Sequence, residues 1–189
     1  MKNLRVGLLG IGTVGGGSFE VLWRNQHEIT RRAGCEIRIT RVADKDQERA
    51  RSIVDGRAEV CDDAFSIVND PAIDVVVELI GGYGLAKSLV IAAIEQGKHV
   101  VTANKALLAI HGDEIFAAAR KHAVIVAFEA AVAGGIPIIK ALREGLTANR
   151  IEWIAGIING TTNFILSEMQ RKGFTICRSI KAGTSTWLC

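Results

Sequence analysis

The sequence predicts an α/β fold, with a doubly wound, mainly parallel sheet that carries helices on both faces, followed by the start of a second α/β domain. Three observations lead to this prediction. Apolar strand-like runs alternate with helix-compatible segments up to Phe128, glycines follow the first strand directly, and the pattern changes after Phe128. Strands that alternate with helices pair in parallel, because each crossover helix returns the chain to the same end of the sheet.

The first strand-like run ends in a glycine motif. The apolar run Leu4–Leu9 leads into the motif, and Gly16–Arg32 after it is compatible with a helix. Glycines at this spacing allow a tight turn, close approach of the backbone to a pyrophosphate, and close packing of helix on strand. The helix start also offers free N–H groups to phosphates. The motif predicts a Rossmann-type dinucleotide site, the alternative being a glycine-rich turn without a ligand. Its proposed cofactor-binding residues are Gly10, Gly12, Thr13, Val14 and Gly15.

The following elements continue the alternation of strand and helix. Asp74–Ile80 is rich in β-branched residues, as is typical of a strand buried on both faces. Acidic residues from Asp44 onward favour a helix start, and Gly97 is suited to end a helix. The other predicted strands are Glu36–Ala43, Lys98–Thr102 and Val124–Phe128, and the other predicted helices are Ala64–Val68, Leu85–Gln96 and Leu107–His122, the last with a break at His111–Asp113.

A second domain is expected to begin near Glu129, where small residues and tight turns replace the alternation. Ile138–Gly145 is predicted to be a short helix and Arg150–Ile158 a strand. A turn over Asn159–Asn163 is then expected to lead into a helix over Phe164–Arg171.

Composition excludes several classes of protein. The 189 residues are 49% hydrophobic with a net charge of +3, so a folded core is expected, and the absence of a basic stripe argues against a nucleic-acid partner. The most apolar stretch, Ala123–Ile139, is interrupted by Glu129, glycines and a proline, so no membrane span is expected. Four cysteines without C-x-x-C spacing and the lack of a signal peptide predict reduced thiols in the cytoplasm.

Polar residues that directly follow predicted strands are the candidates for ligand binding. Ligands of open parallel sheets bind outside the carboxyl ends of the strands, where Asp44, Gly81 and Thr102 are expected in addition to the glycine motif. Asp44 is placed either to bind an adenosine ribose or to cap the next helix. Arg41 and Lys45 flank it and are alternatives for a 2′-phosphate, which leaves the choice between NAD and NADP open.

Two further sites are predicted beyond the cofactor residues. Lys105 follows a strand, where a lysine can hydrogen-bond a carbonyl or act as an acid. A hard cation, which prefers oxygen ligands, is a candidate for a cage of one carboxylate and backbone carbonyls. The alternative is a glutamate that only caps a turn. The cage residues would be Glu129, Val132, Gly134 and Ile136.

Four segments together resemble homoserine dehydrogenase. They are GLLGIGTVG at Gly7–Gly15, VVTANK at Val100–Lys105, FEAAVAGGIP at Phe128–Pro137 and GIINGTTNFIL at Gly156–Leu166. The resemblance covers about Met1 to Gly173. It implies reversible hydride transfer between NAD(P)H and L-aspartate 4-semialdehyde, a small-molecule substrate, to give L-homoserine in threonine, methionine and isoleucine biosynthesis.

The resemblance also implies roles for single residues. The glycine motif and Thr102 would bind NAD or NADP, Lys105 would lie beside nicotinamide and substrate, and Gly160 and Thr161 would face the substrate. The predicted cation would be sodium. Residues 1–128 would form the dinucleotide-binding domain, and residues 129–173 would begin a substrate domain through which family members form homo-oligomers.

Residues 174–189 do not resemble the family. Its members continue into an Ala- and Glu-rich helix, a Gly-x-Ala-Glu-x-Asp-Pro loop and a lysine taken as the proton donor. The tail after Gly173 has none of these segments and neither a helical nor a strand period. We therefore expect an aberrant tail from a shifted reading frame or an otherwise broken gene product, a second domain without most of its core, and impaired turnover. Pairing into a homo-oligomer is correspondingly doubtful. The alternatives are a nucleotide-binding fragment without turnover and a related amino-acid dehydrogenase.

Overall fold

The computed structural model describes residues 3–156, 159–173 and 175–176. It divides into two compact units, residues 1–145 and residues 146–189, which are described separately. The predicted tail, including Cys177 and Cys189, lies almost entirely outside the described residues.

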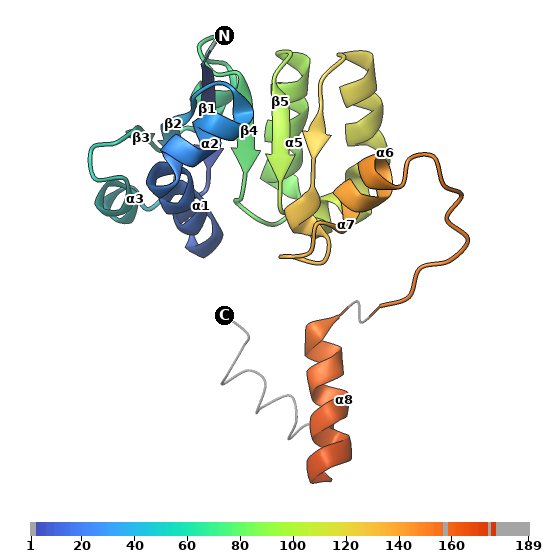
Figure 1. Ribbon diagram of the computed structural model, residues 1–189. Helices are drawn as coiled ribbons and strands as arrows, with labels where there is room; N and C mark the ends of the chain where they lie inside the picture. Colours follow the sequence, from blue (N-terminus) through green and yellow to red (C-terminus); the bar gives the residue numbers. More distant parts are fainter. Residues whose placement is uncertain (1–2, 157–158, 174, 177–189) are drawn as a thin grey trace. The chain divides into compact units, whose positions relative to one another are not determined.

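The first unit is built on a six-stranded sheet in which every pairing is parallel (Figure 1). The strand order is β3-β2-β1-β4-β5-β6. From β1 the chain proceeds outward to β2 and β3, then returns to the other side of β1 for β4, β5 and β6. The strands are β1 (Leu4–Leu9), β2 (Ile37–Ala43), β3 (Glu59–Cys61), β4 (Val75–Glu78), β5 (His99–Thr102) and β6 (Val126–Ala127). This reversal beside β1 is where doubly wound sheets bind ligands.

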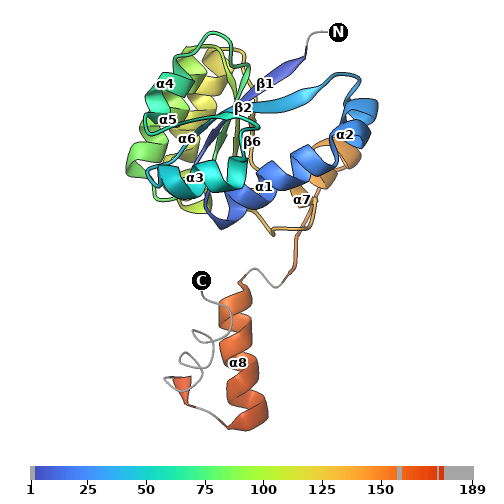
Figure 2. The same cartoon turned by 90° about the vertical axis from the view of Figure 1, so that its left-hand side faces the viewer.

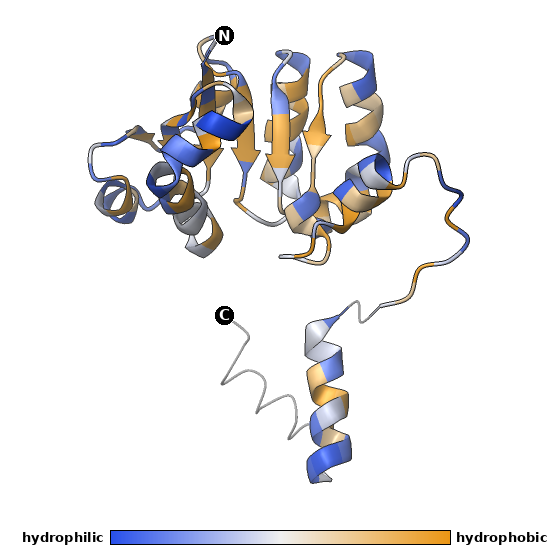
Figure 3. Cartoon of the chain, in the orientation of Figure 1, coloured by the Kyte–Doolittle hydropathy of each residue, from blue (hydrophilic) through white to orange (hydrophobic). Residues whose placement is uncertain are grey.

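Helices cover both faces of the sheet. They are α1 (Thr13–Arg24), α2 (Gln26–Ala33), α3 (Gln47–Val54), α4 (Ala64–Val68), α5 (Gly84–Glu95) and α6 (Lys105–Lys121). Figure 2 shows α4, α5 and α6 together on one side of the sheet and α1 and α2 on the other. Successive strand residues point to opposite faces, so neighbouring Leu8 and Leu9 enter two different buried clusters. Figure 3 shows the strands of the sheet coloured mainly as hydrophobic. The predicted fold class is confirmed.

Two local predictions for the first unit are wrong, and one strand was missed. The single helix predicted over Gly16–Arg32 is two helices that meet at Asn25, whose amide still donates to Val21 O at 3.0 Å. The break predicted at His111–Asp113 is absent, because Gly112 is buried within a continuous α6 and packing outweighs its weak helix propensity of about 1 kcal/mol. Strand β3 was not predicted, since its three residues include an exposed glutamate and show no run of apolar residues.

Residues 129–145 pack within the first unit in this structure. They form a 3₁₀ turn η1 (Glu129–Ala131), a helical turn α7 (Ile138–Lys140) and a π-helical turn η2 (Ala141–Gly145). The predicted short helix over Ile138–Gly145 corresponds to the last two of these turns. The domain boundary near Glu129 remains a prediction.

The second unit contains one described helix, α8 (Gly160–Lys172). It begins earlier than predicted because the Asn159 side chain caps it, accepting from Thr162 N at 2.8 Å. The strand predicted from Arg150 is wrong within its described part, where residues 150–156 have no regular secondary structure. The second unit has no described strand that could supply ladder hydrogen bonds to this segment. Among the described residues, no helix combines the length and the apolar character that a membrane crossing requires.

Candidate dinucleotide site

The three glycines of the motif occupy three different environments. Gly10 has a positive φ of 89°, and a Cβ there would lie 2.8 Å from Leu79 O, so the turn after β1 needs glycine. A Cβ at Gly15 would lie 2.1 Å from Gly10 O, which shows that α1 starts in direct contact with the turn. A Cβ at Gly12 would meet nothing within 4 Å. Only Gly12 therefore borders open space, as expected for the glycine that a pyrophosphate approaches.

Helix α1 begins at this open space without a side-chain cap. Gly12 is its N-cap residue, and the first helical hydrogen bond runs from Gly16 N to Gly12 O at 2.8 Å. The amides of Thr13, Val14 and Gly15 precede that bond and have no acceptor within the helix. Thr13 and Val14 are exposed. The start of α1 can thus donate backbone hydrogen bonds to an anion.

Asp44 is bonded to the glycine turn. Its Oδ2 accepts from Ile11 N at 2.7 Å, and its Oδ1 accepts from Asp46 N at 2.9 Å. The cap of α3 is Asp46, whose side chain accepts from Arg49 N. Asp44 was predicted either to bind a ribose or to cap the following helix, and the second alternative is excluded because Asp46 caps α3. The Asp44 carboxylate instead links the end of β2 to the glycine turn, and each oxygen has a further lone pair for a ribose hydroxyl.

A cavity of about 430 Å³ lies at the carboxyl ends of the strands around β1. Its walls come from the glycine turn, the ends of β2 and β3, the start of α4 and the loop after β4. The lining residues are Gly10, Gly12, Ala43, Asp44, Lys45, Asp62, Asp63, Ala64, Phe65, Leu79, Ile80 and Leu85. This mixture of apolar walls and a few polar groups is typical of a cofactor site. Its position beside Gly12 and Asp44 fits the adenosine part of a dinucleotide.

Arg41 and Lys45 differ in availability for a 2′-phosphate. The Arg41 guanidinium donates to Asp70 Oδ2 at 3.1 Å and to Glu59 Oε1 at 3.2 Å, away from the cavity lining. The interpretation of Arg41 as a phosphate ligand is therefore wrong, because two carboxylates already compensate its charge. Lys45 lines the cavity and has no ion pair with any described residue.

On the β4 side, the expected residues Gly81 and Thr102 are both hydrogen-bonded to the buried side chain of Glu78. Thr102 is fully buried, donates to Glu78 Oε2 at 2.7 Å and accepts from Asn104 N at 3.0 Å. Gly81 N donates to Glu78 Oε1 at 3.3 Å. Glu78 was missed by sequence reasoning, although a charged residue at the end of an otherwise apolar strand was a usable signal. Direct contact of Thr102 and Gly81 with a cofactor remains a prediction.

Lys105 is the first residue of α6 and is exposed. No described residue forms a hydrogen bond or ion pair with its side chain. A cation at a helix N-terminus is unfavourable, because the positive end of the helix dipole lies there. This placement at the end of β5 is consistent with a ligand-binding role.

The proposed cation ligands lie in η1 and the turn that follows it. Glu129 Oε1 accepts from Ile139 N at 2.8 Å, and Oε2 accepts from Lys140 N at 2.9 Å, so the carboxylate caps α7. One carboxylate with backbone carbonyls is a suitable donor set for a hard cation, and capping leaves lone pairs on both oxygens. No cluster of three or more His, Cys, Asp or Glu suited to a metal occurs among the described residues.

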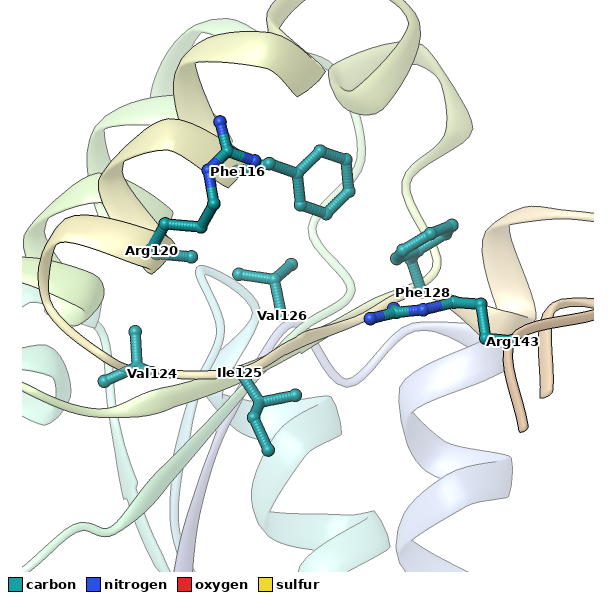
Figure 4. Close-up of a pocket in the computed structure, with 8 residues that line it drawn as sticks. Phe116, Arg120, Val124, Ile125, Val126, Phe128 and Arg143 are labelled. Atoms are coloured by element: carbon teal, nitrogen blue, oxygen red, sulfur yellow. The ribbon is translucent and has the colours of Figure 1, made fainter. Parts of the chain in front are cut away.

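The remaining candidates, Gly160 and Thr161, belong to the other unit. They form the first turn of α8 in the second unit, whereas the proposed cofactor residues belong to the first unit. A second cavity of about 410 Å³ lies over β6 (Figure 4). Phe116, Phe128 and neighbouring aliphatic residues line it together with Arg120 and Arg143. It contains none of the predicted site residues.

Family models match most of the chain. The model described as "Homoserine dehydrogenase, NAD binding domain" matches residues 10–129, and the model described as "Homoserine dehydrogenase" matches residues 137–184. The second match therefore extends into the segment after Gly173 that the sequence suggested was unrelated.

Individual relatives agree with the family models. A homoserine dehydrogenase of Pseudomonas aeruginosa is 63% identical over 176 residues, which cover 93% of this chain and 40% of the relative. The crystal structure of a homoserine dehydrogenase from Thiobacillus denitrificans is 60% identical with a TM-score of 0.92, over 98% of this chain and 43% of that one. A hyperthermophilic archaeal homoserine dehydrogenase in complex with NADPH is 25% identical with a TM-score of 0.81, over 97% and 61% of the two chains. The chain thus spans about 40% of the length of the curated relatives.

Proposed function

The chain belongs to the homoserine dehydrogenase family, and we propose that it binds NAD or NADP at the end of β1 for this family's reaction. That reaction is the reversible reduction of L-aspartate 4-semialdehyde to L-homoserine. The single observation that carries the proposal is that the glycine motif combines two glycines needed for folding with one that borders open space. Gly10 and Gly15 are required by the fold, whereas Gly12 borders open space at an uncapped helix start.

Each part of the cofactor has a proposed partner. The amides at the start of α1 would bind the pyrophosphate, and Asp44 would accept from a ribose hydroxyl. Lys105, Gly81 and Thr102 lie at the strand ends on the other side of β1 and would face the nicotinamide half. The bound cofactor supplies or accepts the hydride. Lys105 would orient the substrate carbonyl through its ammonium group.

Preference between NAD and NADP depends on the cavity wall. Lys45 is the cation available for a 2′-phosphate, whereas Asp44, Asp62 and Asp63 place carboxylates in the same wall. Like charges disfavour a phosphate, and carboxylates favour a free ribose hydroxyl. Titration of the chain with NADH and NADPH compares the two directly.

A second candidate is nucleotide binding without turnover. The proposed cofactor residues all lie in the first unit, whereas the proposed substrate residues Gly160 and Thr161 lie in the second. The test is to mix the chain with NADPH and aspartate semialdehyde while following NADPH absorbance. Binding of NADPH with consumption supports the enzyme, and binding without consumption supports the second candidate. Failure to bind either NADPH or NADH refutes both.

Two additional properties are proposed from the family resemblance. Sodium would be held by the Glu129 carboxylate and the carbonyls of Val132, Gly134 and Ile136. Titration of the chain with sodium, using potassium as the control, would show a sodium-specific rise in thermal stability if this is correct. Homo-oligomerisation would appear in sedimentation velocity as a concentration-dependent species larger than the monomer.

A further inference from the structure

Glu78 is a fully buried carboxylate at the end of β4. Its Oε1 accepts from Ile80 N at 3.0 Å and from Gly81 N at 3.3 Å, and its Oε2 accepts from Thr102 Oγ at 2.7 Å. Both oxygens are therefore engaged, one by the loop after β4 and the other by the end of β5. No ion pair of Glu78 occurs among the described residues.

The network continues from β5 back to the same loop. Thr102 accepts from the amide of Asn104, whose Nδ2 donates to Gly82 O at 2.5 Å. Asn104 Oδ1 accepts from Leu107 N at 3.1 Å and caps α6. The loop after β4 is thus held by Glu78 through its amides and by Asn104 through a carbonyl.

These bonds hold the middle of the loop, Gly81 and Gly82, which has no side-chain packing of its own. Gly81 and Gly82 have positive φ angles of 81° and 67°, and a Cβ at either would meet nothing within 4 Å. Glycines restrict the backbone least, so the loop conformation depends on its hydrogen bonds. A buried carboxylate is costly, and an apolar residue is the usual choice in a parallel strand. The carboxylate is therefore better explained by the loop that it holds than by the stability of the strand.

The position of the loop identifies which part of the cofactor it meets. The start of the loop, Leu79 and Ile80, lines the cavity near Asp44. Gly81 and Gly82 follow it and are bonded to Glu78 and Asn104, from the ends of β4 and β5 on the other side of β1. A dinucleotide spans the reversal point. We infer that Glu78 is a positioning residue that, with Asn104, holds the loop after β4 in shape for the nicotinamide half. This inference rests on the proposed cofactor binding.

The test measures the two halves of the cofactor separately in the full 189-residue chain. Glu78→Gln replaces one acceptor oxygen by an NH₂ donor, so the Thr102 hydroxyl loses its acceptor. We expect the Kd for NADPH to rise about tenfold, the effect of one unsatisfied buried hydrogen bond. The Kd for adenosine 2′,5′-bisphosphate, which has no nicotinamide, is expected to rise much less, because only the start of the loop lines the adenosine cavity. At saturation, the fluorescence of the bound dihydronicotinamide is expected to move toward that of free NADPH.

Two further variants separate positioning from general stability. Asn104→Ser keeps a good helix cap but is too short to reach Gly82, and it is expected to reproduce the selective loss if Glu78→Gln does not fold. Lys98→Met removes a buried charge that directly precedes β5, at the end of the strand opposite to Thr102. Lys98 Nζ donates to Asp70 O and Ile73 O there, and the substitution is expected to leave the ratio of the two Kd values unchanged.

The outcomes distinguish this inference from the proposed function. If the wild-type chain binds neither probe and does not bind NADH, the cofactor proposal is wrong and the role of Glu78 is refuted with it. If it binds NADH alone, the same comparison is made with NADH and adenosine 5′-monophosphate. If the wild-type chain binds both probes and the folded variants weaken both equally or neither, only the positioning role is refuted.

Discussion

Replacing Gly12 by alanine separates folding from cofactor binding. A Cβ at this position meets no atom within 4 Å, and φ is −62°, so the substitution causes no clash and no left-handed strain. Alanine is a poorer N-cap than glycine by up to about 1 kcal/mol, and it restricts the unfolded chain by about 0.4–1 kcal/mol in the opposite direction. The free energy of unfolding is therefore expected to change by less than about 0.5 kcal/mol.

Binding is expected to respond very differently. The added methyl group would occupy the space that a pyrophosphate needs and would displace it from one or two amides at the start of α1. Hydrogen bonds to a charged group contribute about 1.5–3 kcal/mol each, so the Kd for the dinucleotide is expected to rise by about 10–100-fold or more. The measurements are urea unfolding and calorimetric titration with NADH and NADPH.

Gly15→Ala is the matched control in the same motif. Its Cβ would lie 2.1 Å from Gly10 O, a backbone atom that cannot move aside easily, so it is expected to destabilise the fold by about 1–3 kcal/mol. Near-wild-type affinity of a folded Gly12→Ala variant would refute the placement of the pyrophosphate at Gly12. Strong destabilisation by Gly12→Ala would contradict the open space next to this residue.

Three other substitutions test separate parts of the molecule. Lys105→Ala removes a cation from a helix N-terminus, so the free energy of unfolding is expected to rise slightly, by about 0.3–1 kcal/mol. The affinity for NADPH is expected to fall, and an unchanged affinity would argue against a role of Lys105 in binding. The amide of Ala72 and the Arg41 guanidinium lower the pKa of the Asp70 carboxyl, against the effect of burial. The stabilisation by Asp70 is therefore complete above the unfolded pKa of about 3.9 and is lost as pH falls through the lowered pKa. The difference in unfolding free energy between wild type and Asp70→Asn should accordingly shrink on acidification below about pH 4. A difference that stays constant in this range would refute the linkage. Glu129→Gln leaves one amide at the start of α7 without its acceptor, and faster hydrogen exchange over residues 138–145 is expected; unchanged exchange would show that the cap is dispensable.

The alternating pattern of the first 128 residues was sufficient to predict most of the fold. Strands such as Asp74–Ile80 were identified because their β-branched residues are buried on both faces. The break at Asn25 was not predictable, because a turn within a helix needs only one residue to leave helical geometry. Strand β3 escaped detection because it lies at the edge of the sheet, where one neighbour, β2, holds three residues without a strong apolar pattern.

The site was predicted less completely than the fold. The roles of Gly10, Gly12 and Gly15 follow from a motif with known geometry, and the structure gives each a matching environment. Arg41 was misinterpreted because its partners Asp70 and Glu59 are 29 and 18 residues away in sequence. Ion pairs between residues so far apart in sequence depend on how the folded chain brings neighbouring strands together. A local sequence pattern does not contain this information.

The segment after Arg150 shows the same limit for secondary structure. Ile151, Trp153 and Ile154 suggested a strand, yet they are exposed in an irregular segment, with Trp153 77% exposed. The four residues of β5 form a strand because β4 and β6 pair with it on both sides, with Val100 aligned to Val76 and Val126. A strand's backbone groups are satisfied only by a neighbouring strand, whereas a helix satisfies most of its own. The helix over Phe164–Arg171 was therefore predictable from its own residues, although the Asn159 cap that starts α8 earlier was taken as part of a turn. A strand is predictable only together with its partner elsewhere in the fold.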